Sequence, residues 1–393
     1  MIKTTHGGPV EDIAAVLVVI QFLFAWTQLK RRRARWPRPA FLAAVTSLAL
    51  LYGSTLASLW FTWSGAMYKS DFPPLVVRTA GVAAGLFWIF LSTLTLAIVI
   101  CARMLISRVP GMHSAARRQW LAAAGVAAVA APAGIAVFGV VVERNRYRIR
   151  ELDFPVAGLH PDLEGFRISQ VTDLHVSPFL SAREAGRVID MANELRADLA
   201  LFTGDLISEM GDPLDDAIRE LTRLEAPMGV LCCMGNHEAY VGCRDYLARE
   251  ASRAGLLFLR HAATQIRRGQ GILNIAGVDY QRKEDPGGYL PGAERLVVPG
   301  VSNILLSHNP DTFPTAIRRG FQGVLAGHTH GGQVNVEILH QNINPARFRT
   351  PFTSGLYRLD NASCFVSNGI GTIGMPIRLG APPEIALLRL RRA

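Results

Sequence analysis

Four long apolar stretches lie within the first 142 residues and constrain this chain more than any other feature. They are Ile13–Leu29, Ala40–Trp63, Thr79–Cys101 and Trp120–Val142, and the last three reach full membrane-spanning length without a charge. About 20 apolar residues in a helix suffice to cross the hydrocarbon core of a bilayer. We therefore predict an N-terminal region of four transmembrane helices at residues 13–29, 40–63, 79–101 and 120–142.

The charge is divided unevenly along the chain. Residues 1–142 hold 13 Lys and Arg against 3 Asp and Glu, whereas residues 143–393 hold 28 of each sign. The chain is 50% hydrophobic and 18% charged, which argues against a single soluble domain. The neutral second part has no net field to attract phosphate backbones, so we do not expect nucleic acid as a partner.

The basic residues indicate an orientation in the membrane. The first loop carries Lys30 and five arginines and the third carries four arginines, whereas the second loop is nearly uncharged. Positively charged loops stay on the cytoplasmic side. We therefore expect a multi-pass protein of the cell membrane, with the bilayer as a partner and the C-terminal domain on the outer face. The arginines at 144, 146, 148 and 150 oppose this orientation.

None of the four apolar stretches contains an internal Asp, Glu or Lys. Transporters and proton pumps usually need such groups at mid-membrane. The sequence therefore favours a membrane anchor over a transporter.

Beyond residue 143 the pattern is that of an α/β domain, because β-branched runs alternate with helical ones. We predict strands at 167–172, 199–203, 230–234, 272–278, 303–307 and 323–326, and helices at 181–196, 213–224, 243–254 and 311–319. Later strands at 355–359, 364–367 and 385–390 have no helices between them and indicate a second, more antiparallel sheet. The predicted boundaries are a linker at 143–160 and a domain at 161–393.

Polar residues follow five of these strands directly. The elements are Asp173-Leu174-His175, Gly204-Asp205, Gly235-Asn236-His237-Glu238, His308-Asn309 and Gly327-His328-Thr329-His330. The carboxyl ends of strands form the ligand crevice of an open α/β sheet. Each element alone has an ordinary explanation as a turn or a cap, but packing does not account for all five in this order.

The chemistry of this set favours two divalent metal ions. Four His, two Asp and one Asn offer seven nitrogen and oxygen ligands with no thiolate among them. Such a set suits Mn, Zn, Fe or Co, whereas Mg and Ca prefer oxygen alone. Two metals sharing a carboxylate form a template for hydrolysis at phosphorus.

The ordered elements resemble the calcineurin-like metallophosphoesterase superfamily across about residues 165–390. The form Gly-His-Thr-His-Gly-Gly-Gln at 327–333 and the ending Gly369-Ile370-Gly371, Pro376-Ile377-Arg378 and Pro383-Glu384-Ile385 resemble its membrane-anchored bacterial branch, the YkuE/YaeI-type phosphodiesterases. The resemblance implies an αββα sandwich, with two mixed sheets flanked by helices and a dimetal site at one sheet edge.

The resemblance also implies a role for each residue. Asp173, His175, Asp205 and His330 would hold one metal. Asp205, Asn236, His308 and His328 would hold the other, with Asp205 bridging. His237 would be catalytic, facing the substrate phosphate and protonating the leaving oxygen, because imidazole exchanges protons near neutral pH. For Glu238 we weigh two roles, a base and a residue that orients neighbouring groups, and favour the second.

Two departures from related patterns bear on the substrate. Protein phosphatases of the superfamily carry Gly-Asp-x-x-Asp-Arg-Gly, whereas this chain has Leu-Ile-Ser-Glu-Met-Gly after Asp205 and lacks that arginine. Asn368 stands where the bacterial branch is expected to carry a basic residue. The first departure argues against phosphoproteins as substrates, and the second leaves the substrate contacts open.

The sequence therefore predicts a membrane-anchored phosphoesterase. It would hydrolyse a phosphodiester, pyrophosphate or phosphomonoester through a metal-bridging hydroxide, and a lipid-linked substrate is among those expected. The alternatives are a nucleotide hydrolase or nuclease of the same superfamily, and a membrane sensor or scaffold that only holds metal. The non-ligand His237 argues against the scaffold.

Overall fold

A computed structural model describes residues 9–35, 37–63, 89–90, 92–93, 96–98, 100, 104, 134–285, 287–338 and 341–393. The chain divides into two compact units. The first comprises residues 1–142 with 374–377, and the second comprises residues 143–373 with 378–393. Each unit is described by itself below.

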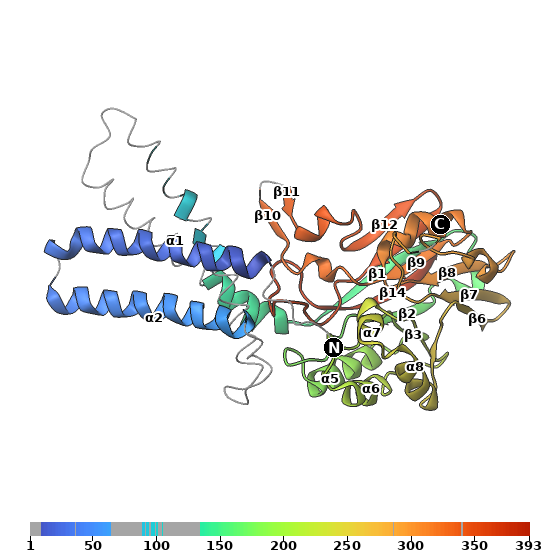
Figure 1. Cartoon of the computed structure of the whole chain (residues 1–393). Coiled ribbons are helices and arrows are strands. Elements are labelled where there is room, and N and C mark those ends of the chain that lie inside the picture. The colour runs from blue at the N-terminus through green and yellow to red at the C-terminus, as the bar shows by residue number, and fades with distance from the viewer. Residues whose placement is uncertain are drawn as a thin grey trace. The chain divides into compact units, whose positions relative to one another are not determined.

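The first unit contains two helices, α1 (Pro9–Arg32) and α2 (Arg38–Trp63), with a short helix, η1 (Arg33–Arg35), between them (Figure 1). The five-residue π-helix η3 (Phe138–Val142) belongs to the same unit. A polar cluster is buried here. The Gln21 amide donates to the carbonyl of Ile89 at 3.0 Å, and the Tyr52 hydroxyl donates to the Gln21 side-chain carbonyl at 3.2 Å.

The prediction of four transmembrane helices is contradicted. Among the described residues, no helix has the length and apolar character needed to cross a bilayer. The predicted N-terminal membrane region is therefore wrong, and so are the multi-pass location and the placement on the outer face that followed from it. The first predicted stretch was marginal in length and contains Gln21, Thr27 and Gln28, and Gln21 is buried in α1. The predicted stretches at 79–101 and 120–142 lie largely outside the described residues.

The second unit contains two six-stranded sheets, which confirms the α/β domain predicted from the sequence. The first sheet has the order β1-β14-β2-β3-β4-β5 and the second has the order β12-β13-β9-β8-β7-β6. Both sheets mix parallel and antiparallel pairs. A separate hairpin pairs β10 (Val336–Ile338) with β11 (Gln341–Ile343).

The first sheet is built from alternating strands and helices. Its strands are β1 (Arg148–Val156), β2 (Arg167–Val171), β3 (Leu199–Phe202), β4 (Val230–Cys232), β5 (Leu256–Phe258) and β14 (Glu384–Arg392). Its helices are α5 (Ala182–Glu194), α6 (Leu214–Leu221), α7 (Asn236–Val241) and α8 (Arg244–Arg253). Figure 1 shows α5, α6 and α8 gathered beside this sheet. Ser181 caps α5 in a reciprocal capping box with Glu184, as the sequence predicted.

The second sheet contains β6 (Ala262–Arg268), β7 (Gly271–Gly277), β8 (Ser302–Leu306), β9 (Gly323–Ala326), β12 (Gly355–Leu359) and β13 (Ala362–Val366). The helix α9 (Phe313–Arg318) lies between β8 and β9 in the sequence. The remaining short helices are η4 (Glu143–Asn145), η5 (Pro161–Leu163), η6 (Ala293–Leu296), η7 (Pro310–Thr312), η8 (His330–Gly332) and η9 (Pro345–Phe348).

The side-chain alternation of each strand shows how the layers pack. In β3, Leu199 and Leu201 face a core shared with the second sheet, whereas Ala200 and Phe202 face the helices. The second sheet follows the same rule. Leu325 of β9 enters the shared core, and its neighbours Val324 and Ala326 pack with Phe313 of α9. Because these strands are buried on both faces, their sequences are continuous apolar runs. The two sheets pack face to face with helices on their outer faces, which makes a helix-sheet-sheet-helix sandwich.

The predicted linker at 143–160 contains β1, which pairs in parallel along its whole length with β14 at the other end of the chain. The last strand, β14, therefore belongs to the first sheet, whereas β12 and β13 form the antiparallel pair predicted for the second. The strands β5 and β6 and the short helix α7 were not predicted.

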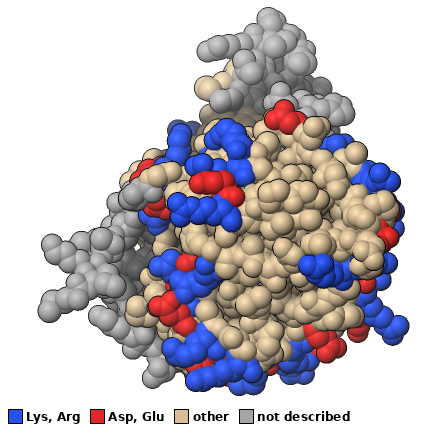
Figure 2. Space-filling view, turned by 90° about the vertical axis from the view of Figure 1, so that its right-hand side faces the viewer, with Lys and Arg blue, Asp and Glu red and all other residues tan. Residues whose placement is uncertain are grey.

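Charged side chains of both signs are interspersed on the surface. Arg391, for example, pairs with Asp153 at 3.1 Å and with Glu164 at 3.2 Å. Figure 2 shows Lys and Arg next to Asp and Glu around an uncharged centre on one face. The described part of this face therefore offers no continuous basic surface of the kind that binds a nucleic-acid backbone.

Candidate metal centre

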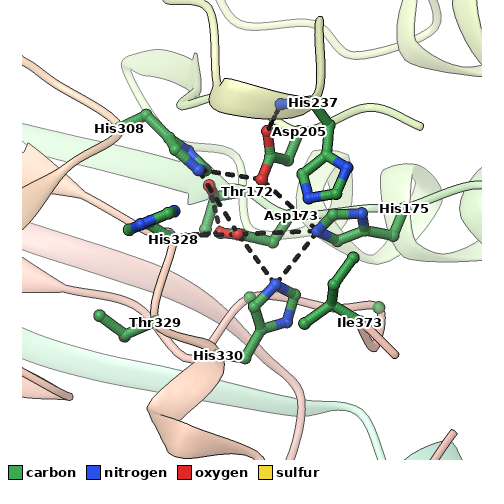
Figure 3. Close-up of polar contacts among 12 residues, drawn as sticks. Thr172, Asp173, His175, Asp205, His237, His308, His328, Thr329, His330 and Ile373 are labelled. Carbon is green, nitrogen blue, oxygen red and sulfur yellow. Dashed lines mark hydrogen bonds and ion pairs between the residues drawn. The ribbon is translucent and has the colours of Figure 1, made fainter. Parts of the chain in front are cut away.

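The strand ends of both sheets bring the seven predicted ligand residues together. Asp173 and His175 follow β2, Asp205 follows β3, and Asn236 begins α7 after β4. From the second sheet, His308 follows β8, and His328 and His330 follow β9. Figure 3 shows most of these side chains converging on one point. Six of the seven, Asp173, His175, Asp205, Asn236, His308 and His330, belong to buried residues, and His328 is half-buried.

One group consists of Asp173, His175 and His330, whose ligand atoms all lie within 4.8 Å of one another. Asp173 Oδ1 lies 3.3 Å from His330 Nε2 and 4.0 Å from His175 Nε2. The two imidazole Nε2 atoms lie 3.1 Å apart. Three buried ligand atoms therefore face a common centre from two different sheets.

A second group consists of Asp205, His308 and His328, again within 4.8 Å of one another. Asp205 Oδ2 lies 3.0 Å from His308 Nε2. The side-chain oxygen of Asn236 lies 3.1 Å from the same His308 nitrogen, so Asn236 borders this group as predicted.

Asp205 links the two groups. Its Oδ2 lies 3.6 Å from His175 Nε2 in the first group, in addition to its contact with His308 in the second. A third group joins His175, Asp205 and His237 within the same 4.8 Å limit. The backbone N–H of His237 donates to Asp205 Oδ1 at 2.9 Å. Asp205 therefore occupies the position that a carboxylate shared by two metals would need.

Hydrogen bonds on the far side of two of the rings, those of His308 and His175, aim these histidines inward. His308 Nδ1 lies 2.7 Å from the carbonyl oxygen of Thr203, and His175 Nδ1 lies 3.1 Å from the Ser208 hydroxyl. Each bond leaves Nε2 as the nitrogen that faces the carboxylates. The buried Nδ1 of His330 has no hydrogen-bond partner among the described residues.

The backbone around the site is held in an uncommon conformation. Asp173, His175, Asp205, His328 and His330 all have positive φ angles, between 48° and 74°. Such conformations cost roughly 1–3 kcal/mol each for residues with a side chain and cluster at functional sites. Side chains of an extended segment point alternately to opposite sides. The bend at 328–330 therefore explains how His328 and His330 both reach the site.

Two glycines of the motifs are required by close approach. A Cβ atom on Gly235 would overlap the Asp205 carboxylate, and a Cβ on Gly327 would overlap the Asp173 carboxylate and the Thr172 hydroxyl. The glycines therefore let neighbouring backbone pack directly against the two aspartates.

Glu238 supports the turn that carries Asp205. Its buried carboxylate accepts backbone N–H groups of Gly235 at 2.7 Å, Leu206 at 2.6 Å and Asp205 at 3.1 Å. Burial, and then the charge of Asp205, raise the pKa of Glu238 to about 7. Glu238 thus orients the loop, in agreement with the role that the resemblance implied.

Burial dominates the titration of the imidazoles. It lowers the pKa of His175 to about 3 and that of His328 to about 4. His308 differs because the adjacent carboxylates, Asp205 foremost, outweigh burial and raise its pKa to about 10. Burial likewise opposes the ionisation of Asp205, but the charge of His308 beside it brings the pKa of Asp205 below its usual range.

The donor set fits divalent metal ions. Imidazole nitrogens and carboxylate oxygens crowd a buried centre, and the Nε2 atoms of His175 and His330 lie 3.1 Å apart. A cation that accepts several nitrogen and oxygen ligands would satisfy these groups together. The clustered His and Asp residues therefore indicate divalent metal binding.

Two supporting residues were missed by the sequence reasoning. The Thr172 hydroxyl donates to Asp173 Oδ2 at 2.7 Å, although Thr172 had been assigned only to the strand. Arg378 is fully buried and donates to carbonyl groups of the segment 368–371 that packs on Asp173. Arg378 had been noted only as part of a resembling motif, and a lone arginine in a loop gives no signal of burial.

Comparison with known proteins identifies the family. The family model described as calcineurin-like phosphoesterase matches residues 166–332. A metallophosphoesterase of Aquifex aeolicus is 30% identical over 57% of this chain and 85% of its own length. This chain belongs to the calcineurin-like metallophosphoesterase family.

Two further relatives carry the same designation. The metallophosphoesterase YkuE of Bacillus subtilis is 29% identical over 58% of this chain and 80% of its own length. The metallophosphoesterase Cj0846 of Campylobacter jejuni is 30% identical over 62% of this chain, and the aligned region spans 63% of that relative. The resemblance to the family, including YkuE, is therefore confirmed. Membership supports a metal-dependent phosphoester hydrolase.

Proposed function

We propose that this chain is a dimetal phosphoesterase that hydrolyses a phosphodiester, a pyrophosphate or a phosphomonoester. The observation that carries the proposal is the position of Asp205 between two groups of buried ligand atoms. A carboxylate shared in this way is what a pair of metals about 3.5–4 Å apart requires.

Each metal would have its own set of ligands. Asp173, His175 and His330 would hold one ion with Asp205, and Asn236, His308 and His328 would hold the other with Asp205. The nitrogen-rich donor set favours Mn, Zn, Fe or Co. Bound there, the two ions would supply charge stabilisation for the phosphoryl oxygens and lower the pKa of the attacking water.

His237 is the residue that we assign to proton transfer. It is half-buried, its backbone is tied to Asp205, and its ring packs edge-on against the ring of His175 with the centroids 4.7 Å apart. Its Nδ1 contacts the carbonyl oxygen of Ser208 and donates to it. That bond leaves Nε2 to hold a proton for the leaving oxygen of the substrate.

The test uses the purified full chain loaded with Mn²⁺ or Zn²⁺. Hydrolysis of bis(4-nitrophenyl) phosphate and of 4-nitrophenyl phosphate is measured for the wild type, Asp205→Asn and His237→Ala. We expect Asp205→Asn to lose bound metal together with turnover. We expect His237→Ala to keep its metal and to lose about 10²–10⁴-fold in turnover, the range for a general acid.

The matched controls are His160→Asn and Asp216→Asn, which change the same residue types outside the site. Both should retain wild-type turnover. Metal bound at the site without turnover of either ester would contradict the proposal and favour a protein that only holds metal. The ratio of diester to monoester turnover assigns the substrate type.

A further inference from the structure

Two tyrosines extend the site from the histidines toward solvent. The Tyr280 ring lies 5.3 Å from the His328 ring and 6.1 Å from the His308 ring, measured between centroids. The Tyr240 ring lies 5.6 Å from the ring of His237. Tyr240 is 55% exposed, so its ring forms part of the open rim of the site.

An arginine is seated on this rim. The guanidinium carbon of Arg282 lies 5.1 Å from the centre of the Tyr240 ring, in a cation–π contact. The cation–π contact with Tyr240, whose ring packs on that of His237, therefore places Arg282 beside the site.

The Arg282 guanidinium retains donors for a ligand. Arg282 is exposed, and among the described residues it forms no ion pair with a carboxylate. The nearby Asp285 carboxylate accepts the backbone N–H of Arg282 at 2.7 Å. Five N–H donors in a planar fork suit phosphate and carboxylate groups.

Neither the segment after Asp205 nor the buried Arg378 offers a comparable donor. The segment after Asp205, residues 206–211, contains neither Lys nor Arg. The buried Arg378 is occupied by backbone carbonyls. An anionic group of a substrate that projects outward past His237 and His328 would therefore meet Arg282.

We infer that Arg282, held by Tyr240, binds a second anionic group of the substrate, beyond the phosphate that is hydrolysed. This deepens the proposed function and rests on it. The substrate class is a phosphoester or phosphoanhydride that carries a further phosphate or carboxylate. A simple monoanionic diester has no such group and would contact only the metal site and His237. Arg282 is thus a specificity-determining residue.

The test compares binding of AMP and ADP to the metal-loaded full chain by titration calorimetry. The two probes differ by one phosphate. We expect the wild type to prefer ADP and Arg282→Gln to lose roughly tenfold in ADP affinity while AMP affinity stays unchanged, as for loss of one charged hydrogen bond. Tyr240→Leu, which removes the aromatic ring under the guanidinium, should show a smaller loss of the same kind.

The matched control is Lys283→Gln, which removes the same charge from the adjacent exposed residue. It should keep the preference for ADP. Equal ADP-to-AMP affinity ratios in the wild type and Arg282→Gln, or an equal loss in Lys283→Gln, would overturn the inference. Bound metal is measured after each titration, so that stripping of metal by ADP is recognised. Because binding is the readout, a chain that binds ADP through Arg282 but hydrolyses no ester would contradict only the proposed function.

Discussion

Oδ2 of Asp205 lies 3.0 Å from Nε2 of His308, although the two residues come from different sheets. Asp205 follows β3 of the first sheet, and His308 follows β8 of the second. The site therefore exists only when the two sheets are packed face to face. Formation of the metal centre and packing of the shared core are parts of one folding event.

Metal removal should destabilise the protein because the ligands come from both sheets. A ligand that binds only the folded state at 100 times its Kd adds about 2.7 kcal/mol to the free energy of unfolding. We expect the Tm of the second unit to fall when a chelator is added and to recover with Mn²⁺ or Zn²⁺. Calorimetry of the full chain checks this. Asp205→Asn should show a much smaller metal-dependent shift, and an equal shift would argue that metal stabilises the chain elsewhere.

Replacing Glu238 by Gln should weaken metal binding without touching a proposed ligand. The amide cannot accept all three backbone N–H groups that the carboxylate now holds. An unsatisfied buried donor costs about 1–3 kcal/mol, so both stability and metal affinity should fall. Chemical denaturation and metal titration measure the two effects. Glu250→Gln on the surface is the control, and unchanged metal affinity in Glu238→Gln would remove Glu238 from its supporting role.

Arg378 should be needed for a stable metal centre. Its guanidinium donates to carbonyl oxygens of Asn368 and Ala381 at 2.9 Å each and of Gly369 at 3.2 Å. The same segment contacts the site, because the Gly371 N–H donates to the Asp173 carbonyl at 2.7 Å. Arg378→Met should lower the free energy of unfolding by about 3 kcal/mol or more, since several buried carbonyls lose their donors.

Arg378→Lys should recover part of that loss, because a lysine can still reach some of the carbonyls. Metal affinity is measured at a temperature where each variant is folded. It should decrease from the wild type to Arg378→Lys and further to Arg378→Met. Arg358→Met, at an exposed position, is the control. Wild-type metal affinity in a folded Arg378→Met protein would show that the arginine supports only the loop.

Gly235→Ala should disrupt the site through sterics alone. The added methyl group would overlap the Asp205 carboxylate, which must then move from its position between the two ligand groups. We expect loss of metal binding and a destabilisation of about 1–3 kcal/mol, the usual cost of overpacking. Gly53→Ala, where nothing lies within 4 Å of the new methyl group, should leave metal binding intact. Retention of wild-type metal affinity by Gly235→Ala would contradict the geometry described.

The strand ends were predictable because chemistry and topology agree there. β2, β3, β8 and β9 are short strands that are followed within two or three residues by Asp or His, and parallel strands place such ends at one edge. Asp173, Asp205 and His308 could therefore be assigned to one site before any distance was known.

Other features depend on long-range packing and leave no local signal. The pairing of β1 with β14 joins Arg148 to Glu384, and nothing in either segment specifies the partner. The burial of Arg378 and the stacking of Arg282 on Tyr240 have the same origin. The transmembrane prediction was wrong because apolar composition was taken as sufficient evidence for a membrane span.

The most direct test of the dimetal account is a stepwise metal titration. Metal-free full chain is titrated with Mn²⁺, while bound metal and the turnover of bis(4-nitrophenyl) phosphate and of 4-nitrophenyl phosphate are measured on the same samples. The account predicts that turnover appears as the second equivalent binds and is absent in Asp205→Asn. Full turnover with one equivalent, or no turnover of either ester with two equivalents bound, would contradict it.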